Sequence, residues 1–272
     1  MKPSVAILGA GAMGSIIGRG LLSVGWPPDR IAMCDPDEER RVAVSADTGL
    51  RVLPSAVDAV ASADVIVVAV KPSIVRMLLA ELAGAVTSNQ LVITLAAGVP
   101  LVVFEAALPG VPVVRTMPNT PAAVEQAMTA YAGGRHVDER LLESAREILA
   151  SIGEVVEVPE SALDAVTAVS GSGPAYVFLL AEALTDAGID QGLPEDVAQQ
   201  LVNQTLRGAG LLLHDSNRSA AELRIQVTSP NGTTAAALER FEAGGFHSLV
   251  ADAVSAARKR SQELGEEAAA SD

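Results

Sequence analysis

The first half of the chain alternates short apolar runs with segments of helical character. The runs are aliphatic or β-branched along most of their length, and Gly or Pro often follows them. Strands of this kind are typical of a parallel sheet that helices cover on both faces. The predicted strands are Val5–Leu8, Ile31–Asp35, Arg51–Leu53, Asp64–Val70, Leu91–Ala96, Val111–Arg115, Ala127–Ala132 and Glu154–Val158. Helices are expected from the end of the first strand to about Val24, and over Asp37–Ala46 and Glu139–Ile152.

The second half of the chain shows no convincing strand after about Pro159. Its apolar positions follow helical spacing instead. The predicted helices are Pro174–Ala187, which Gly188 should end, Pro194–His214, Ser219–Gln226, Thr233–Glu242 and Phe246–Leu264. The acidic, alanine-rich stretch 265–272 is expected to be a frayed end.

Composition narrows the class of protein. The chain has 272 residues, is 49% hydrophobic and has a formal net charge of −14, so we expect a well-packed protein that does not bind nucleic acid. With three lysines, Lys2, Lys71 and Lys259, an anionic ligand must be held by backbone dipoles or a few placed cations. The lone cysteine, Cys34, excludes an intrachain disulfide, and three scattered histidines lack metal-ligand spacing, so no metal site is predicted.

No targeting or membrane segment is predicted. The apolar run after Lys2 is too short for a secretory signal, and runs such as Val65–Val70 are too short to cross a bilayer. We therefore expect a cytoplasmic protein that binds a small molecule and no membrane.

A glycine-rich turn follows the first strand and opens the first helix. In Gly9-x-Gly11-x-x-Gly14 the first glycine permits the turn, the second lets the backbone approach a pyrophosphate, and the third allows close helix–strand packing. With Ala12 and Met13 at the helix start, this turn predicts binding of NAD(H) or NADP(H). The fold class is therefore α/β: a Rossmann-type parallel sheet domain over residues 1–160, followed by an all-helical domain over residues 161–272.

Asp35 ends the second strand, 21 positions beyond Gly14. A carboxylate there can accept hydrogen bonds from the adenosine ribose, which favours NAD. Arg40 and Arg41 follow closely and could bind the 2′-phosphate of NADP instead, so the sequence leaves the cofactor open. The alternative interpretation of Asp35 is a helix cap before Pro36.

Three later strand ends should face the same crevice, because ligands of open α/β sheets bind beyond the carboxyl ends of the strands. Ala69, Lys71 and Pro72 follow the strand ending at Val70, and Lys71 could also simply be a solvated strand end. Further residues expected beside the nicotinamide half are Ala97, Gly98 and Asn119.

Two loops of small residues are predicted to open helices in the second half of the chain. They are Ser170–Pro174, in which Ser172 or Gly173 could cap a helix, and Val227–Thr234. Free N–H groups at helix starts bind carboxylates and phosphates without a basic side chain. The alternative is two ordinary turns that cap two ordinary helices.

Taken together, these motifs resemble those of the pyrroline-5-carboxylate reductases, over nearly the whole chain. The resemblance is carried by Gly9–Gly14, Ala69–Pro72, Arg115–Pro121, Ala168–Tyr176 and Val227–Thr234, in the family's order. It implies reduction of the cyclic imine 1-pyrroline-5-carboxylate to L-proline by NAD(P)H, the last step of proline biosynthesis. It also implies a Rossmann domain, a helical domain that forms a homodimer, and in some members a ring of dimers.

The resemblance also implies roles for individual residues. The turn of Ser229, Asn231, Gly232 and Thr233 would hold the substrate carboxylate through backbone N–H groups, with Ser172 and Gly173 nearby. Thr234 would place its hydroxyl near the ring nitrogen and is the expected catalytic residue. The site would lie between the two domains, with the partner subunit contributing.

Three positions depart from the family pattern. Asn231 stands where a glycine is usual, but Asn tolerates a positive φ, so the loop should keep its shape. Residues 122–126 lack the glycines that often follow the Met-Pro-Asn-Thr-Pro motif. The loop 214–218 offers no clear equivalent of a glutamate that many members carry.

Other functions are weighed against this one. A β-hydroxyacid dehydrogenase would need a lysine after the domain junction, yet no lysine lies between Ser170 and Leu238. A reductase of another cyclic imine has no such counter-argument. A catalytically silent nucleotide sensor is disfavoured by the intact Ser229–Thr234 signature.

Overall fold

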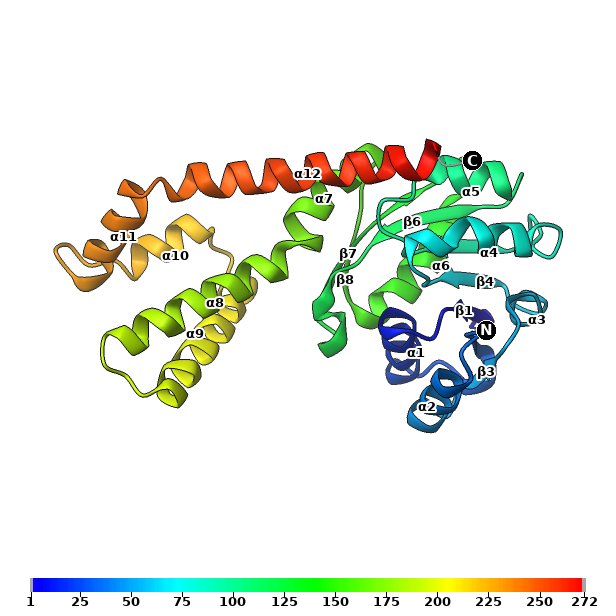
Figure 1. Cartoon of the computed structure of the whole chain (residues 1–272), viewed down its shortest axis with the longest axis horizontal. Helices are drawn as coiled ribbons and strands as arrows, with labels where there is room; N and C mark the ends of the chain where they lie inside the picture. Colours follow the sequence, from blue (N-terminus) through cyan, green and yellow to red (C-terminus); the bar gives the residue numbers. More distant parts are fainter. Residues whose placement is uncertain (1, 271–272) are drawn as a thin grey trace. The chain divides into compact units, whose positions relative to one another are not determined.

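The computed structural model describes residues 2–270, which form two compact units. One comprises the chain up to Ser172 together with the residues from Ala257 onward, and the other is Gly173–Ala256. Each unit is described by itself. The first contains the sheet and the second is helical (Figure 1).

The first unit is built on an eight-stranded sheet in the order β3-β2-β1-β4-β5-β6-β7-β8. Each strand expected from the sequence is present, with ends that differ by a few residues. The order of the first six strands reverses between β1 and β4, which is the Rossmann arrangement with its switch point there. The strands are β1 (Val5–Leu8), β2 (Ile31–Cys34), β3 (Arg51–Leu53), β4 (Val65–Val68), β5 (Leu91–Thr94), β6 (Val113–Met117), β7 (Ala127–Gly133) and β8 (Gly153–Glu157).

One strand pair departs from the expected parallel sheet. β6 and β7 are antiparallel, with Val114 opposite Gly133 and Met117 opposite Ala130, whereas the other pairs in the sheet are parallel. The reason is the connection between them, residues 118–126, which holds a 3₁₀ segment, η3 (Thr120–Val124). It is too short for the crossover that a parallel pair requires.

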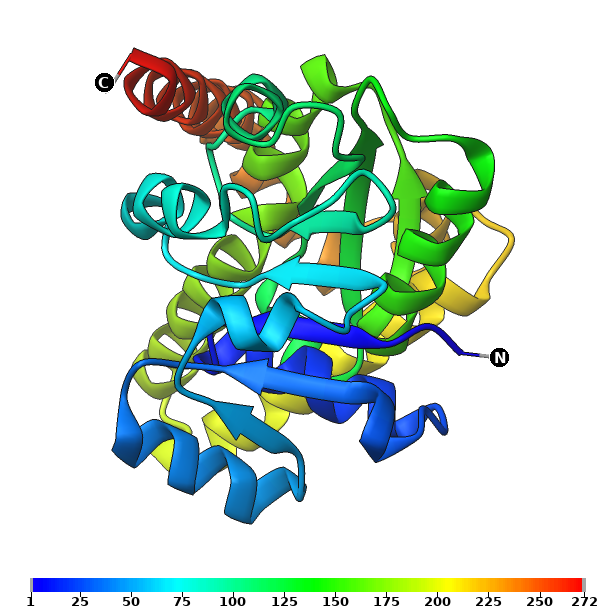
Figure 2. The same cartoon turned by 90° about the vertical axis from the view of Figure 1, so that its right-hand side faces the viewer.

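Helices cover both faces of the sheet (Figures 1 and 2). On one face α1 (Ala12–Ser23) and α6 (Glu139–Leu149) pack against strand residues such as Ile7 and Val67. On the other face lie three short helices that the sequence did not reveal: α3 (Ala56–Val60), α4 (Val75–Leu82) and α5 (Leu101–Ala107). At this length a helix gives too few turns for its periodicity to stand out. The charged helix α2 (Glu38–Thr48) follows β2.

A helix begins at Gly173, as expected, but Ser172 does not have the extended conformation of a helix N-cap. α7 (Leu163–Val166) runs directly into a π turn, Thr167–Gly171, in which the N–H of Ser172 donates to the carbonyl of Thr167 at 2.8 Å. Ser172 is itself helical, with φ −85° and ψ −19°, and α8 (Gly173–Asp190) follows at once. The π turn therefore joins α7 to the start of α8.

The helical unit contains α8, α9 (Glu195–Asp215), α10 (Ala220–Gln226), α11 (Thr233–Ala243) and the first part of α12 (Phe246–Ala270). Gly188 does not end α8 as expected, since the helix continues to Asp190. Gly188 faces α9, where a Cβ on it would lie 3.4 Å from the Cβ of Ala198. The turn after α8 instead uses Gly192, with φ +92°.

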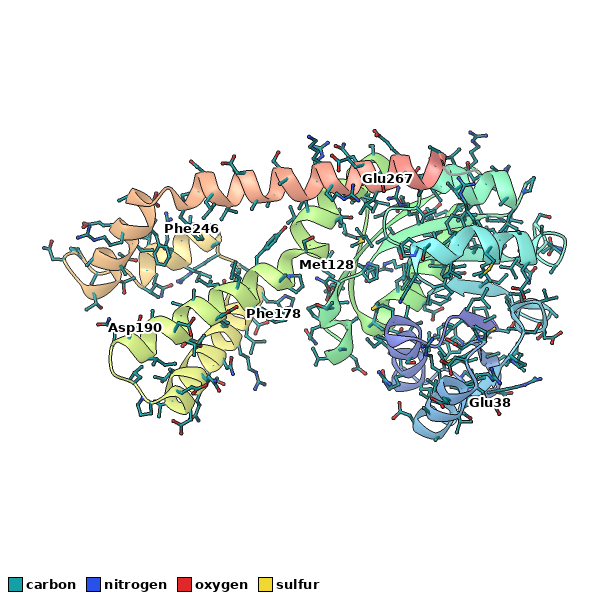
Figure 3. The ribbon with its side chains drawn as sticks, viewed as in Figure 1. Glu38, Met128, Phe178, Asp190, Phe246 and Glu267 are labelled. Carbon is teal, nitrogen blue, oxygen red and sulfur yellow. The ribbon has the colours of Figure 1, made fainter. Side chains whose placement is uncertain are left out.

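Residues 265–270 are helical where fraying was expected, and the last two residues of that prediction, 271–272, lie outside the described residues. α12 continues to Ala270, and the guanidinium of Arg76 donates to the carbonyl of Ala268 at 2.7 Å. The backbones of Gly98 and Gly265 approach closely, since a Cβ on Gly265 would lie 3.3 Å from the Gly98 carbonyl oxygen. The last turns of α12, where Figure 3 labels Glu267, thus pack beside α4 and α5.

Candidate functional site

The turn after β1 requires glycine at its first and third positions. Gly9 has φ +102°, and a Cβ on it would lie 2.7 Å from the carbonyl oxygen of Ala69 at the end of β4. A Cβ on Gly14 would lie 1.9 Å from the Gly9 carbonyl oxygen. Neither position can hold a side chain, so α1 starts directly against the two central strands.

Gly11 differs from the other two glycines. It caps α1 with φ −73°, and a Cβ there would meet nothing within 4 Å. No side chain caps the helix, so its first N–H groups, which include those of Ala12 and Met13, face outward without an intrahelical acceptor. A helix start with this geometry binds phosphate groups, and the space at Gly11 is what a pyrophosphate needs.

A cleft of about 590 Å³ opens from this turn at the switch point of the sheet. That volume lies within the usual range for small-ligand sites. It gathers six of the residues predicted to bind the cofactor: Gly9, Gly11, Ala12, Asp35, Ala69 and Lys71. The sequence did not identify other residues of its lining, which include Pro54, Val70, Ile74, Met77, Leu78 and Glu81. The sequence held a partial signal for them, because Val70 and Ile74 come shortly after the end of β4, at the edge of the sheet where ligands bind.

Asp35 lies in this cleft, but its carboxylate is engaged within the protein. One oxygen accepts the N–H of Ala10 at 3.0 Å and the other accepts the N–H of Asp37 at 3.0 Å. The guanidinium of Arg40 lies 3.1 Å away, and only 4% of the Asp35 side chain is exposed. Asp35 thus fixes the loop between β2 and α2, whereas Asp37 is the residue that caps α2.

The two arginines after β2 are placed differently. The side chain of Arg40 is 48% exposed and borders the cleft. Arg41 donates to the backbone carbonyls of Asp35 and Pro36 at 3.1 and 2.8 Å. Arg40 therefore borders the cleft while it pairs with Asp35, and Arg41 holds the loop.

Cys34 borders the cleft beneath the loop after β2. Burial, together with the nearby charges of Asp35 and Glu81, raises the pKa of its thiol to about 11. The thiol is therefore protonated at neutral pH and serves as a small apolar side chain.

Other residues predicted to bind the cofactor lie outside the lining of this cleft. Met13 belongs to the first turn of α1, where it is partly buried and packs against the core. Pro72 begins the 3₁₀ segment η2 (Pro72–Ile74). Ala97 is exposed, and Gly98, with φ +75°, lies against Leu264 of α12. The space that a ligand at Gly98 would need is bounded by the C-terminal helix.

Asn119 follows β6 and uses both ends of its amide within the protein. Its Nδ2 group donates to the carbonyl and hydroxyl oxygens of Ser170 at 3.2 and 3.3 Å. Its Oδ1 atom accepts the N–H of Met128, a residue labelled in Figure 3, at 2.9 Å. Asn119 therefore joins the end of β6 to β7 and to the π turn Thr167–Gly171.

In the helical unit, the turn before α11 has the conformation expected from the sequence. Asn231 has φ +55°, which confirms that asparagine adopts the left-handed conformation there. The N–H of Gly232 donates to the carbonyl of Ser229 at 3.1 Å, and a Cβ on Gly232 would lie 2.3 Å from the Ser229 hydroxyl. Gly232 caps α11 without a side chain, so the N–H groups of Thr233 and Thr234 lie in the uncapped first turn.

The helical unit exposes many large apolar side chains. They lie mainly on α8 and α9, with others on α12; Figure 3 labels Phe178 of α8 and Phe246 of α12. One helical run, 160–190, has the length and composition of a bilayer span, with a mean hydropathy of 1.3. Apolar surface of this extent marks an interaction surface.

Comparisons with known proteins agree with this architecture. Residues 160–264 match the family described as pyrroline-5-carboxylate reductase dimerisation, and residues 4–98 match the family described as NADP oxidoreductase coenzyme F420-dependent. A pyrroline-5-carboxylate reductase from Pseudomonas aeruginosa is 43% identical over 97% of this chain and 98% of its own length.

Solved structures give the same result. A pyrroline-5-carboxylate reductase from Coxiella burnetii is 34% identical, with a TM-score of 0.93 over 97% of this chain and 99% of the other. The pyrroline carboxylate reductase of Plasmodium falciparum, solved with NADP bound, is 29% identical, with a TM-score of 0.86 over 97% and 99% of the two chains.

Proposed function

The chain belongs to the pyrroline-5-carboxylate reductase family, and on that premise we propose which of its residues reduce 1-pyrroline-5-carboxylate to proline. The reaction adds a hydride to the imine carbon and a proton to the ring nitrogen, in the last step of proline biosynthesis. The observation that carries the assignment of residues is the cleft at the sheet switch point, with its glycine turn and uncapped helix start.

The glycine turn and α1 would hold the cofactor. Gly11 leaves room for the pyrophosphate, and the first N–H groups of α1 would bind its oxygens. Pro54, Ile74 and Met77 would give the cleft an apolar wall for the adenine ring. The bound nicotinamide cofactor supplies the hydride.

The turn before α11 would hold the substrate. Its carboxylate would accept N–H groups from the first turn of α11, where Gly232 provides no competing cap. The hydroxyl of Thr234 would orient the imine nitrogen. A protonated imine is already an electrophile, so the residues have only to position it, and no lysine or histidine base is needed.

We infer that NADPH is the preferred cofactor. The Asp35 carboxylate is almost fully buried and already accepts two backbone N–H groups, which leaves it poorly placed to accept ribose hydroxyls. Arg40 is half-exposed at the cleft and can pair with a 2′-phosphate. The NADP bound to the Plasmodium relative is consistent with this preference.

The experiment follows cofactor oxidation by absorbance with 1-pyrroline-5-carboxylate, using NADPH and NADH in parallel. Turnover with a higher kcat/KM for NADPH supports both proposals. Arg40→Ala should lower kcat/KM for NADPH about tenfold or more while changing that for NADH little. Arg41→Ala is the matched control, because Arg41 holds the loop and its loss should affect both cofactors equally.

Binding of both cofactors without turnover of 1-pyrroline-5-carboxylate would contradict the substrate assignment and favour another cyclic imine. Equal losses for NADPH and NADH in Arg40→Ala would contradict the role of Arg40.

The chain is a homo-oligomer by its dimerisation family match, and we propose a homodimer, with a ring of dimers as a further form. The exposed apolar side chains of α8 and α9 would be covered by the second copy. The same contact would account for the apolar run 160–190 in a cytoplasmic enzyme. Light scattering tests this, and a monomer at micromolar concentration would contradict it.

A further inference from the structure

We propose that Asn119 is a positioning residue for the substrate side of the site. Its side chain holds the π turn Thr167–Gly171 in shape and does not bind the cofactor. This inference rests on the proposed function and on the expectation from the family resemblance that Ser172 and Gly173, directly after the π turn, lie near the substrate. It replaces the expectation from the sequence that Asn119 binds the nicotinamide cofactor.

One carbonyl of the π turn lacks its α-helical donor. In an α-helix the carbonyl of Ser170 would accept the N–H of the residue four positions later. That residue is Pro174, which has no N–H. The Nδ2 group of Asn119 donates to this carbonyl at 3.2 Å and to the Ser170 hydroxyl oxygen at 3.3 Å. The asparagine amide thus takes the place of the missing backbone donor.

The other end of the amide is fixed by β7. The Oδ1 atom of Asn119 accepts the N–H of Met128 at 2.9 Å. An asparagine amide has two donor hydrogens, and the two oxygens of Ser170 can use both. A cofactor that bound the Asn119 amide group would therefore have to displace Ser170.

A second contact from the end of β6 supports the same turn. A Cβ on Gly171 would lie 2.4 Å from the terminal carbon of Met117, so Met117 fills the space beside Gly171. Asn119 and Met117 therefore hold the turn at adjacent points. A π turn is rarer than an α turn and occurs mostly where function requires it, so it needs such external support.

Loss of the Asn119 contact should leave the Ser170 carbonyl without this donor and let the register of the turn shift. A shift by one residue rotates the following side chain by about 100°, since an α-helix has 3.6 residues per turn. Ser172 would then leave its place toward the substrate, while the glycine turn after β1 would be unchanged. The defect should therefore appear in substrate binding and not in cofactor binding.

The test measures KM and kcat for both substrates in Asn119→Asp. Aspartate keeps the oxygen that accepts from Met128 but replaces the donor that faces Ser170 with a second oxygen. We expect the KM for 1-pyrroline-5-carboxylate to rise about tenfold or more, with the KM for NADPH changed less than twofold. Asn89→Ala, at an exposed asparagine, is the control and should match the wild type. A rise confined to the KM for NADPH would overturn the proposal.

A backbone rescue separates this role from general destabilisation. Pro174→Ala gives residue 174 an N–H that can donate to the Ser170 carbonyl. In Asn119→Ala/Pro174→Ala the KM for 1-pyrroline-5-carboxylate should therefore fall back at least fivefold from its value in Asn119→Ala. If the increase in KM for the double variant equalled the product of the increases for the two single variants, the proposal would be contradicted. Such a product means that the two substitutions act independently, because independent sites are additive in free energy.

The contact can also be tested apart from the reaction. If the wild-type protein fails to turn over 1-pyrroline-5-carboxylate, the proposed function is wrong, and amide hydrogen exchange still tests the contact. Exchange of the Ser172 N–H, which donates to Thr167, should be at least tenfold faster in Asn119→Asp than in the wild type. Equal exchange rates would overturn the positioning role.

Discussion

Two glycines of the cofactor turn should respond to the same substitution in opposite ways. Gly11→Ala places a methyl group in open space, at a residue whose φ of −73° suits alanine. Gly14→Ala places a methyl group 1.9 Å from the carbonyl oxygen of Gly9. The first change should spare folding and impair cofactor binding, and the second should impair folding itself.

The magnitudes follow from these distances. At Gly11 the only folding cost is the poorer cap that alanine makes, about 0.5–1 kcal/mol. At Gly14 an ordinary contact of about 3.4 Å would need a shift of roughly 1.5 Å between α1 and β1. Overpacking on this scale costs about 1–3 kcal/mol or more in the free energy of unfolding. For binding, a methyl group between the backbone and the pyrophosphate should weaken NADPH by about tenfold to a hundredfold, or about 1.4–2.7 kcal/mol.

Urea unfolding gives the stability of each variant, and fluorescence titration with NADPH gives its affinity. Two results would refute the reasoning. If Gly11→Ala bound NADPH as tightly as the wild type, Gly11 would not lie against the cofactor. If Gly11→Ala lost as much stability as Gly14→Ala, the space at Gly11 would not be open in the folded protein.

Three further substitutions test the structure of the sheet unit. The hydroxyl of Thr129 is fully buried without a hydrogen-bond partner, so Thr129→Val should raise the free energy of unfolding by about 1–2 kcal/mol. Thr116→Val is the matched control. The buried Thr116 hydroxyl donates to the Thr94 carbonyl at 2.9 Å, so this substitution should lower the free energy of unfolding by about 1 kcal/mol. The pKa of Cys34 is raised from 9.0 to about 11, so the thiol ionises at a lower pH in the unfolded chain than in the folded protein. The free energy of unfolding should therefore hold its full value below pH 9 and fall by up to about 2–3 kcal/mol as the pH rises to 11. Unfolding measured against pH should show this fall in the wild type and not in Cys34→Val. Glu125 has φ +57°, so Glu125→Gly should raise the melting temperature by relieving about 0.5–1 kcal/mol of backbone strain, and an unchanged or lower value would contradict this account.

The sequence was sufficient to predict the sheet because each strand carries its own signal. Runs such as Val65–Val68 are buried at every position, and a run with that pattern has few alternatives to a central strand. The glycine turn was also predictable, since its constraints come from backbone geometry that only glycine satisfies. Strand direction was less predictable. The antiparallel β7 depends on the length of the connection before it, and its apolar pattern resembles that of a parallel strand.

Side-chain roles were harder to predict than backbone features because they depend on partners that are distant in sequence. Asp35 and Asn119 are both residues that commonly contact ligands, and both stand at strand ends that face the crevice. In the structure Ala10 and Arg40 engage the first, and Ser170 and Met128 engage the second. Nothing in the local sequence distinguishes a carboxylate or amide that is free for a ligand from one that the fold has used.

Binding of two anions by a protein of net charge −14 follows from the same distinction between backbone and side chain. The start of α1 and the start of α11 are both capped by glycine without a side-chain hydrogen bond. Each therefore offers uncompensated N–H groups, at the expected pyrophosphate site and the expected carboxylate site respectively. Because the backbone supplies the donors, residue identity matters there only through φ and size. Asn231 meets the first condition, with φ +55°, in place of the glycine usual in the family. This accounts for how a chain with three lysines can hold both a dinucleotide and an amino-acid carboxylate.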